Sequence, residues 1–208
     1  MKFWDDEYGN WQGLASPEQA PRYQLIVDVI DRFCPKGSVL DVGCGEAVLL
    51  DYLAPNTIYF GIEPSAKAVE GARTRGACDC IRCTMAEDFE DDGRRWDCIV
   101  FNEVLYYTKN PCALLTKYAR LVKGDGIIIV SIFQRPGHSI KAQLLHWLEP
   151  SRPISNLHCG TMVHKFILRE GWPIQEDKLV PIPGTRVHWR IWVMNPRRAK
   201  EVGIFRAA

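Results

Sequence analysis

The stretch Val39-Leu40-Asp41-Val42-Gly43-Cys44-Gly45-Glu46-Ala47 decides how the rest of the sequence is interpreted. The short apolar run from Ser38 to Val42 ends in closely spaced glycines, which is typical of a buried parallel strand. Glycines after such a strand let the backbone come close to a ligand, and N–H groups at the start of a following helix are free to bind it. The stretch therefore predicts a strand that leads directly into a ligand-binding loop.

The segments on either side alternate between helix and strand patterns. The expected helices are Tyr23–Phe33, Glu46–Leu53, Ser65–Arg75, Pro111–Val122 and Met162–Glu170, and the expected strands are Ser38–Val42, Ile58–Ile62, Ile81–Met85, Asp97–Asn102 and Gly126–Phe133. Repeated βαβ units predict a mostly parallel sheet with helices on both faces. Two further strands, Ile174–Val180 and Val187–Met194, are joined by a short turn and must pair antiparallel. The fold class is α/β, with a three-layer sandwich around a seven-stranded sheet.

Composition excludes several classes of protein. Apolar residues make up 47% of the 208 residues and charged residues 25%, as in an ordinary globular chain. The 26 basic and 25 acidic residues nearly cancel, so there is no general positive field for nucleic acid or an anionic membrane. No apolar run approaches the roughly 20 residues of a membrane span, and the first residues do not resemble a secretion signal. We expect a cytoplasmic protein with one domain.

Eight cysteines are present, and the tightest group is Cys78, Cys80 and Cys83. Their C-x-C-x-x-C spacing is compatible with zinc, but a structural zinc site usually has four ligands and paired C-x-x-C units. No second cluster follows in the sequence. We therefore expect reduced thiols and no metal.

The opening stretch resembles the first motif of class I S-adenosylmethionine-dependent methyltransferases, which carries an acid two residues before G-x-G. The resemblance covers residues 36–133 closely and implies a Rossmann-like fold with S-adenosylmethionine as cofactor. It places Asp41, Gly43 and Gly45 against the methionine part of the cofactor. Ala47 stands where the family often has a third glycine.

A nicotinamide-binding protein shows a similar strand, turn and helix. Its G-x-G-x-x-G fingerprint requires glycine at position 48, where this chain has Val48, and an acid farther along than Glu63. A nicotinamide oxidoreductase is therefore the least favoured alternative.

The resemblance also implies how the rest of the cofactor is held. Glu63, at the end of the second strand, is expected to accept hydrogen bonds from both ribose hydroxyls, and Pro64 follows it. Met85, Ala86 and Glu87 resemble the loop that surrounds adenine. The acidic run that they begin is also compatible with a solvated loop.

The fourth strand ends where the family places the reactive methyl group. Asn102 is expected to take the amino group of the cofactor, whereas Glu103, Tyr106 and Tyr107 can face the substrate. The run EVLYY at residues 103–107 resembles small N-methyltransferases such as those of rhizobial nodulation-factor synthesis.

Few residues of such an enzyme need be catalytic, because the cofactor is already a strong electrophile. A general base would help to deprotonate the acceptor. His138, after the fifth strand, is the first candidate, and Glu103, Tyr107 and His158 come next.

The N-terminal segment is expected to fold over the cofactor, so that Tyr8 or Arg22 meets its carboxylate; surface packing is the alternative for both. The expected parts of the single domain are an N-terminal cap and helix at 1–35, a cofactor-binding core at 36–133, a lid-like insert at 134–160, and a C-terminal helix and hairpin at 161–208.

We therefore expect a methyltransferase that acts on nitrogen or oxygen of a small molecule. Two alternatives stay open: a methyltransferase that acts on RNA or protein, and a cofactor-binding regulatory partner without catalysis. The methyl acceptor and the oligomeric state do not follow from the sequence.

Overall fold

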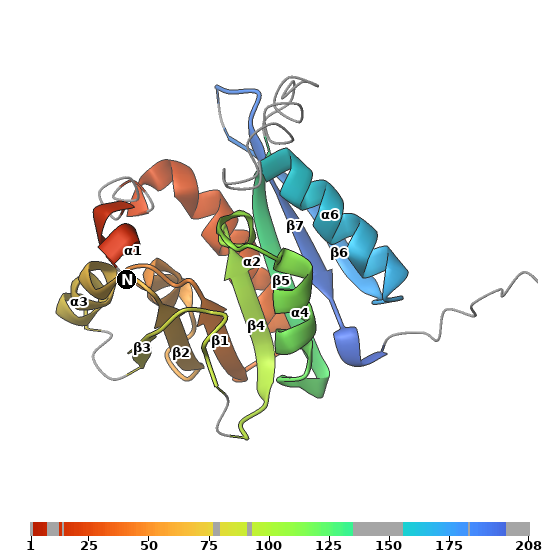
Figure 1. Ribbon diagram of the computed structural model, residues 1–208, viewed down its shortest axis with the longest axis horizontal. Coiled ribbons are helices and arrows are strands. Elements are labelled where there is room, and N and C mark those ends of the chain that lie inside the picture. The colour runs from red at the N-terminus through yellow and green to blue at the C-terminus, as the bar shows by residue number, and fades with distance from the viewer. Residues whose placement is uncertain are drawn as a thin grey trace, which may run out of the picture.

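The computed structural model describes residues 2–7, 13, 15–76, 80–90, 93–134, 156–182 and 184–198. Within these residues seven strands form one sheet in the order β3-β2-β1-β4-β5-β7-β6 (Figure 1). Their bounds are β1 Ser38–Val42, β2 Ile58–Glu63, β3 Ile81–Cys83, β4 Trp96–Asn102, β5 Val122–Gln134, β6 Ile174–Pro181 and β7 His188–Met194. Strands β1 to β5 pair in parallel, and β7 is antiparallel to both of its neighbours. The predicted mostly parallel sheet with an antiparallel C-terminal strand is confirmed.

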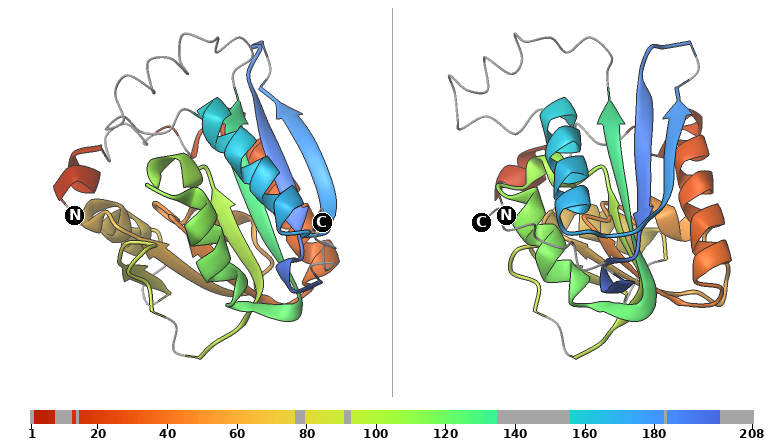
Figure 2. Two further views of the ribbon diagram at one scale, coloured as in Figure 1. Left: turned by 45° about the vertical axis from the view of Figure 1, so that its right-hand side comes forward. Right: turned by 90° about the vertical axis from the view of Figure 1, so that its right-hand side faces the viewer.

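Helices cover both faces of this sheet. They are α1 Lys2–Glu7, α2 Ala20–Phe33, α3 Ala66–Thr74, α4 Pro111–Ala119 and α6 Asn156–Arg169, with short 3-10 turns at Pro17–Gln19, Val48–Tyr52, Leu105–Tyr107 and Pro196–Arg198. Figure 2 shows the sheet edge-on, with α2 on one side and α4 and α6 on the other. One apolar core lies under α4 and α6, and a second core lies under α2 and α3. The three-layer sandwich is therefore confirmed.

Helix α3 begins and ends where capping rules place it. The Ser65 side chain accepts a hydrogen bond from the Ala68 N–H over 3.2 Å, and Gly76 follows the helix with a φ of +99°. Because Glu63 and Ser65 are separated only by Pro64, the helix start lies immediately beside the end of β2.

Three predicted boundaries are corrected. The expected helix Glu46–Leu53 is only a 3-10 turn at Val48–Tyr52, because Ala47 still has a left-handed φ of +57°. Strand β5 starts at Val122, where the expected helix was to end, because Val122 pairs with Trp96. Helix α6 starts at Asn156 and not at Met162. It runs through Gly160, whose missing side chain makes room for Gln134.

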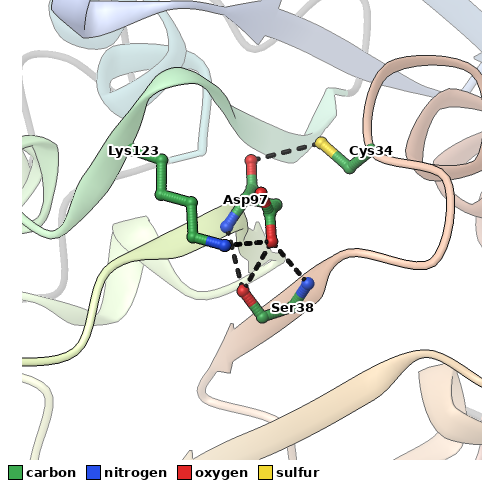
Figure 3. A network of polar contacts seen from close by, with 4 residues as sticks. All are labelled: Cys34, Ser38, Asp97 and Lys123. Atoms are coloured by element: carbon green, nitrogen blue, oxygen red, sulfur yellow. Dashed lines mark hydrogen bonds and ion pairs between the residues drawn. The ribbon is translucent and has the colours of Figure 1, made fainter.

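Asp97, at the start of β4, contacts three residues from other segments: Cys34 just after α2, Ser38 at the start of β1 and Lys123 near the start of β5 (Figure 3). Its Oδ2 atom accepts hydrogen bonds from the Ser38 N–H and hydroxyl, each over 2.8 Å, and from Lys123 Nζ over 2.7 Å. The Cys34 thiol donates to its backbone carbonyl over 3.2 Å. Partial burial acts to raise the pKa of Asp97, but Lys123 and Ser38 outweigh it and hold the pKa below its ordinary value.

Residues 135–155 of the predicted lid lie outside the described residues. In the described part of the chain, no helix is long and apolar enough to cross a membrane. No disulfide joins any two of the seven cysteines within it, and no group of residues there has the make-up of a metal site; Cys78 is not among them.

Candidate active site

A cavity opens at the carboxyl ends of β1, β2 and β4. Every predicted site residue whose side chain the structure describes lines it: Arg22, Asp41, Gly43, Gly45, Glu63, Pro64, Met85, Ala86, Glu87, Asn102, Glu103 and Tyr107. Tyr8 and His138 lie outside the described residues, and the side chain of His158 is also not described. Residues from positions 22 to 107 of the sequence therefore meet in one place.

The glycine loop, residues 43–45, lines the cavity. Gly43 and Gly45 have φ values of +71° and +56°, which side chains rarely adopt. A Cβ atom on Gly43 would lie 2.5 Å from Val104 Cγ2. The N–H groups of Gly43 and Cys44 donate to the Ile62 carbonyl over 2.8 and 3.1 Å, which fixes the loop to the end of β2.

Asp41 is a buried acid of which only one oxygen has a partner. Its Oδ2 atom accepts a hydrogen bond from the Tyr59 hydroxyl over 3.0 Å, while Oδ1 has no partner among the described residues. Burial raises the pKa of Asp41 to about 7, and the charge of Glu63 adds to this effect. A carboxylate in this condition is suited to accept a hydrogen bond from a cationic ligand.

Glu63 lines the cavity, and two backbone N–H groups bind its carboxylate. Oε2 accepts from the Gly45 N–H over 3.0 Å and Oε1 from the Ser65 N–H over 2.9 Å. Burial raises the pKa of Glu63, and these two N–H groups oppose the rise. Each carboxylate oxygen retains a second acceptor site, so the group can still bind two neighbouring hydroxyls.

Arg22 reaches the cavity from α2. It is 1% exposed, and its guanidinium carbon lies 4.9 Å from the centre of the Tyr23 ring and 5.0 Å from that of Trp189. Nη1 lies 3.8 Å from Glu103 Oε2, whereas Nε and Nη2 have no partner among the described residues. A buried cation with two unused donors is suited to bind an anionic group.

Glu103 follows β4 with a left-handed φ of +64°, a backbone conformation that is costly for a residue with a side chain. Its carboxylate accepts from Ser131 Oγ and from the Tyr106 hydroxyl, each over 3.1 Å. Burial raises the pKa of Glu103, and Arg22 acts against this rise. Next to it, Asn102 Oδ1 is buried and has no partner among the described residues.

Residues 18–166 match the protein family described as a methyltransferase domain. The chain belongs to this family. The observed seven-stranded, mostly parallel sheet agrees with the methyltransferase fold.

Curated relatives are similar to part of this methyltransferase domain. A ubiquinone biosynthesis O-methyltransferase of Neisseria meningitidis is 30% identical over 143 residues, which are 64% of this chain and 58% of that protein. A protein of the same name from Glaesserella parasuis is 31% identical over 155 residues, which are 67% of this chain and 64% of that protein. The chain thus spans about three fifths of the length of these relatives.

Solved structures show the same fold at lower identity. N-methyltransferase NodS from Bradyrhizobium japonicum, in complex with S-adenosyl-L-homocysteine, has a TM-score of 0.67 and 16% identity, covering 93% of this chain and 97% of that chain. Magnesium protoporphyrin IX methyltransferase from Synechocystis, with bound S-adenosyl-L-homocysteine, has a TM-score of 0.64 and 17% identity, covering 85% and 82%. At this identity the likeness shows the fold.

Sequence reasoning missed residues that line or support the cavity of this methyltransferase domain. Trp4 of α1 lines it and meets Tyr107 edge-on, with 5.9 Å between ring centroids. Tyr59 and Ser131 hold Asp41 and Glu103 from neighbouring strands. Tyr59 stands two residues before Gly61, which pairs with Asp41 in the adjacent strand, and this strand register could not be predicted from the sequence. No local pattern marked Trp4.

Proposed function

We propose that this chain is an S-adenosylmethionine-dependent methyltransferase that transfers the methyl group to nitrogen or oxygen of a small molecule. One observation carries the proposal. The described residues leave four buried polar atoms of the cavity without partners: Arg22 Nε and Nη2, Asp41 Oδ1 and Asn102 Oδ1. Two donors and two acceptors complement the carboxylate and ammonium groups of an amino acid.

The remaining cavity residues fit the nucleoside part of the same cofactor. Glu63 offers a doubly held carboxylate for the ribose hydroxyls. Met85, Ala86 and Glu87 line the cavity beyond it, where the adenine ring would lie. At Gly45 a Cβ atom would meet nothing within 4 Å, so the missing side chain lets a ligand approach the protein backbone closely.

When bound, the cofactor supplies an electrophilic methyl group on sulfur. The chain would hold the cofactor, orient the acceptor and exclude water. Trp4 and Tyr107 stand edge to face at the cavity and would cover the reacting atoms. Glu103 and Tyr107 remain candidates for taking the proton of the acceptor, as does His138 outside the described residues. Each oxygen of Glu103 accepts one hydrogen bond, from Ser131 or from Tyr106, and retains a second acceptor site that could take the proton.

Two observations support a small molecule over RNA or protein. The relatives include a ubiquinone biosynthesis O-methyltransferase and the similar structures include a magnesium protoporphyrin IX methyltransferase, and both are named for small molecules. In addition, two arginines of the basic C-terminal segment pair with acids: Arg190 with Asp177, and Arg198 with Asp125. They are therefore poorly suited to bind phosphates.

Transfer of a radiolabelled methyl group tests the proposal. The full chain would be incubated with labelled S-adenosylmethionine and, in separate reactions, with pools of amines, phenols and carboxylic acids, with total RNA and with protein extract. We expect label in at least one small-molecule pool and its loss in Asp41→Ala. Label confined to RNA or protein would contradict the small-molecule acceptor.

A further inference from the structure

The turn at residues 85–88 forms one wall of the cavity. The N–H groups of Asp88 and Phe89 both donate to the Met85 carbonyl, over 3.1 and 3.0 Å, so the chain makes a single helical turn. In such a turn the carbonyl groups point along the axis in one direction and the first N–H groups point in the other. One side of the turn is therefore rich in acceptors and the other in donors.

Two side chains of α4 hold the acceptor side of this turn. The Tyr118 hydroxyl donates to the Ala86 carbonyl over 3.0 Å. Lys117 Nζ donates to the Glu87 carbonyl over 2.6 Å and lies 3.4 Å from the Ala86 carbonyl. The carbonyl groups that follow Met85 are thus bound from α4, on the side of the turn away from the ligand cavity.

Tyr118 is rigidly placed for this contact. It is fully buried, stacks on Phe89 with 6.2 Å between ring centroids, and meets Phe101 edge-on at 5.2 Å. Burial raises the pKa of Tyr118 above its ordinary value, so its hydroxyl remains a donor at neutral pH. A buried tyrosine hydroxyl needs a hydrogen-bond partner, and for Tyr118 this partner is the Ala86 carbonyl.

The orientation of one peptide group follows from these contacts. A trans peptide is planar, so a carbonyl of Ala86 that points to Tyr118 sends the N–H of Glu87 in the opposite direction. Ala86 and Glu87 both line the cavity. If the peptide rotated, a carbonyl acceptor would replace an N–H donor at the surface of the cavity.

We propose that Tyr118 and Lys117 are positioning residues that set which purine base the cavity accepts. The inference rests on the proposed function. Adenine carries an unprotonated N1, which can accept a hydrogen bond from the Glu87 N–H. Hypoxanthine carries a proton at N1 and would leave the Glu87 N–H unpaired. Neither Tyr118 nor Lys117 lines the cavity, so both would act through the turn.

The test compares two ligands on the full chain by calorimetry: S-adenosylhomocysteine and its S-inosyl analogue. The variants are Tyr118→Phe, which removes only the hydroxyl, and Lys117→Met, which keeps the apolar stem and remains informative if the first variant does not fold. Tyr52→Phe is the matched control, because Tyr52 stacks on Tyr23 and does not line the cavity. Thermal unfolding checks each variant.

We expect the wild-type chain and Tyr52→Phe to prefer the adenine ligand strongly. In Tyr118→Phe and Lys117→Met the preference should fall about threefold to tenfold, through weaker binding of the adenine ligand and little change for the inosine ligand. A merely structural role would lower the affinity for both ligands by the same factor. Equal losses of affinity, or an unchanged preference for the adenine ligand, would overturn this inference and leave the proposed function standing. Failure of the wild-type chain to bind either ligand overturns the proposed function as well.

Discussion

Tyr59 donates a hydrogen bond to Oδ2 of Asp41 across two adjacent parallel strands, with 3.0 Å between the oxygens. The other oxygen of Asp41 is buried and unpaired within the described residues. Gly61, which is paired with Asp41, leaves the space in which the Tyr59 hydroxyl and the Cys44 sulfur lie. The sheet thus presents a carboxylate that is oriented by one partner and still able to bind a second.

Cofactor binding should depend on the ionisation of Asp41. Burial raises its pKa to about 7, so the carboxylate is mostly protonated below that pH and ionised above it. A ligand ammonium group binds the ionised form, and the affinity for S-adenosylhomocysteine should therefore rise about fivefold to tenfold between about pH 6 and pH 7.5. Calorimetry at both pH values measures this change.

Methylthioadenosine is the control for this pH dependence, because it has the ribose and adenine but no amino group. Its affinity should change little over the same range. Asp41→Asn should also bind S-adenosylhomocysteine with little pH dependence. An equal rise for both ligands in the wild-type chain would assign the titration to another group, such as Glu63.

Arg22→Lys should weaken binding of ligands that carry an amino-acid carboxylate. Lysine is a point charge and lacks the planar fork of donors that the two unpaired nitrogens of Arg22 provide. We expect the affinity for S-adenosylhomocysteine to fall about tenfold or more and that for methylthioadenosine to be retained. Arg32→Lys, at the pair with Glu176, is the matched control. Equal losses for both ligands would show that Arg22 only supports the fold.

Gly43→Ala should destabilise the chain. Its φ of +71° is strained for alanine, and the new Cβ would lie 2.5 Å from Val104 Cγ2. The free energy of unfolding should fall by about 2 kcal/mol or more. Denaturant unfolding measures the loss. Gly124→Ala adds the same methyl group where nothing lies within 4 Å, and equal stability of the two variants would refute the argument.

Asp97→Asn tests the network that joins β1, β4 and β5. The variant loses the ion pair to Lys123, and its hydrogen bonds from Ser38 are no longer made to a charged oxygen. The free energy of unfolding should therefore fall by about 2 kcal/mol near neutral pH. Because the folded pKa of Asp97 is lowered, its contribution is present above the unfolded pKa of about 3.8 and disappears as the pH falls through the folded value. A stability difference from wild type that persists in strong acid would contradict this explanation.

Local patterns were sufficient for the parts of the fold that depend on near neighbours. The buried run at Ser38–Val42, the Ser65 cap and the acid at Glu63 were all predictable, because each rests on periodicity or on a few adjacent residues. Boundaries failed where tertiary pairing took over. Val122 is a strand residue because it meets Trp96, although its own segment continues a helical pattern.

Side chains that support the site from other elements could not be predicted. Tyr59 donates to Asp41 because of the register between their strands. Ser131 donates to Glu103 from β5, and Tyr118 donates to the Ala86 carbonyl from α4. Each separation in sequence is 18 residues or more. These contacts depend on the assembled sheet, and a single sequence contains no periodic signal for them.

Titration of the full chain with S-adenosylhomocysteine is the most direct test of the central claim, since binding does not require knowledge of the methyl acceptor. Glu63→Gln places an amide where two backbone N–H groups and the ribose hydroxyls need acceptors, and Glu176→Gln is the control at an ion pair with Arg32 outside the cavity. We predict micromolar binding by the wild-type chain and by Glu176→Gln and its loss in a folded Glu63→Gln. Absence of binding by the folded wild-type chain, or undiminished binding by Glu63→Gln, would contradict the account.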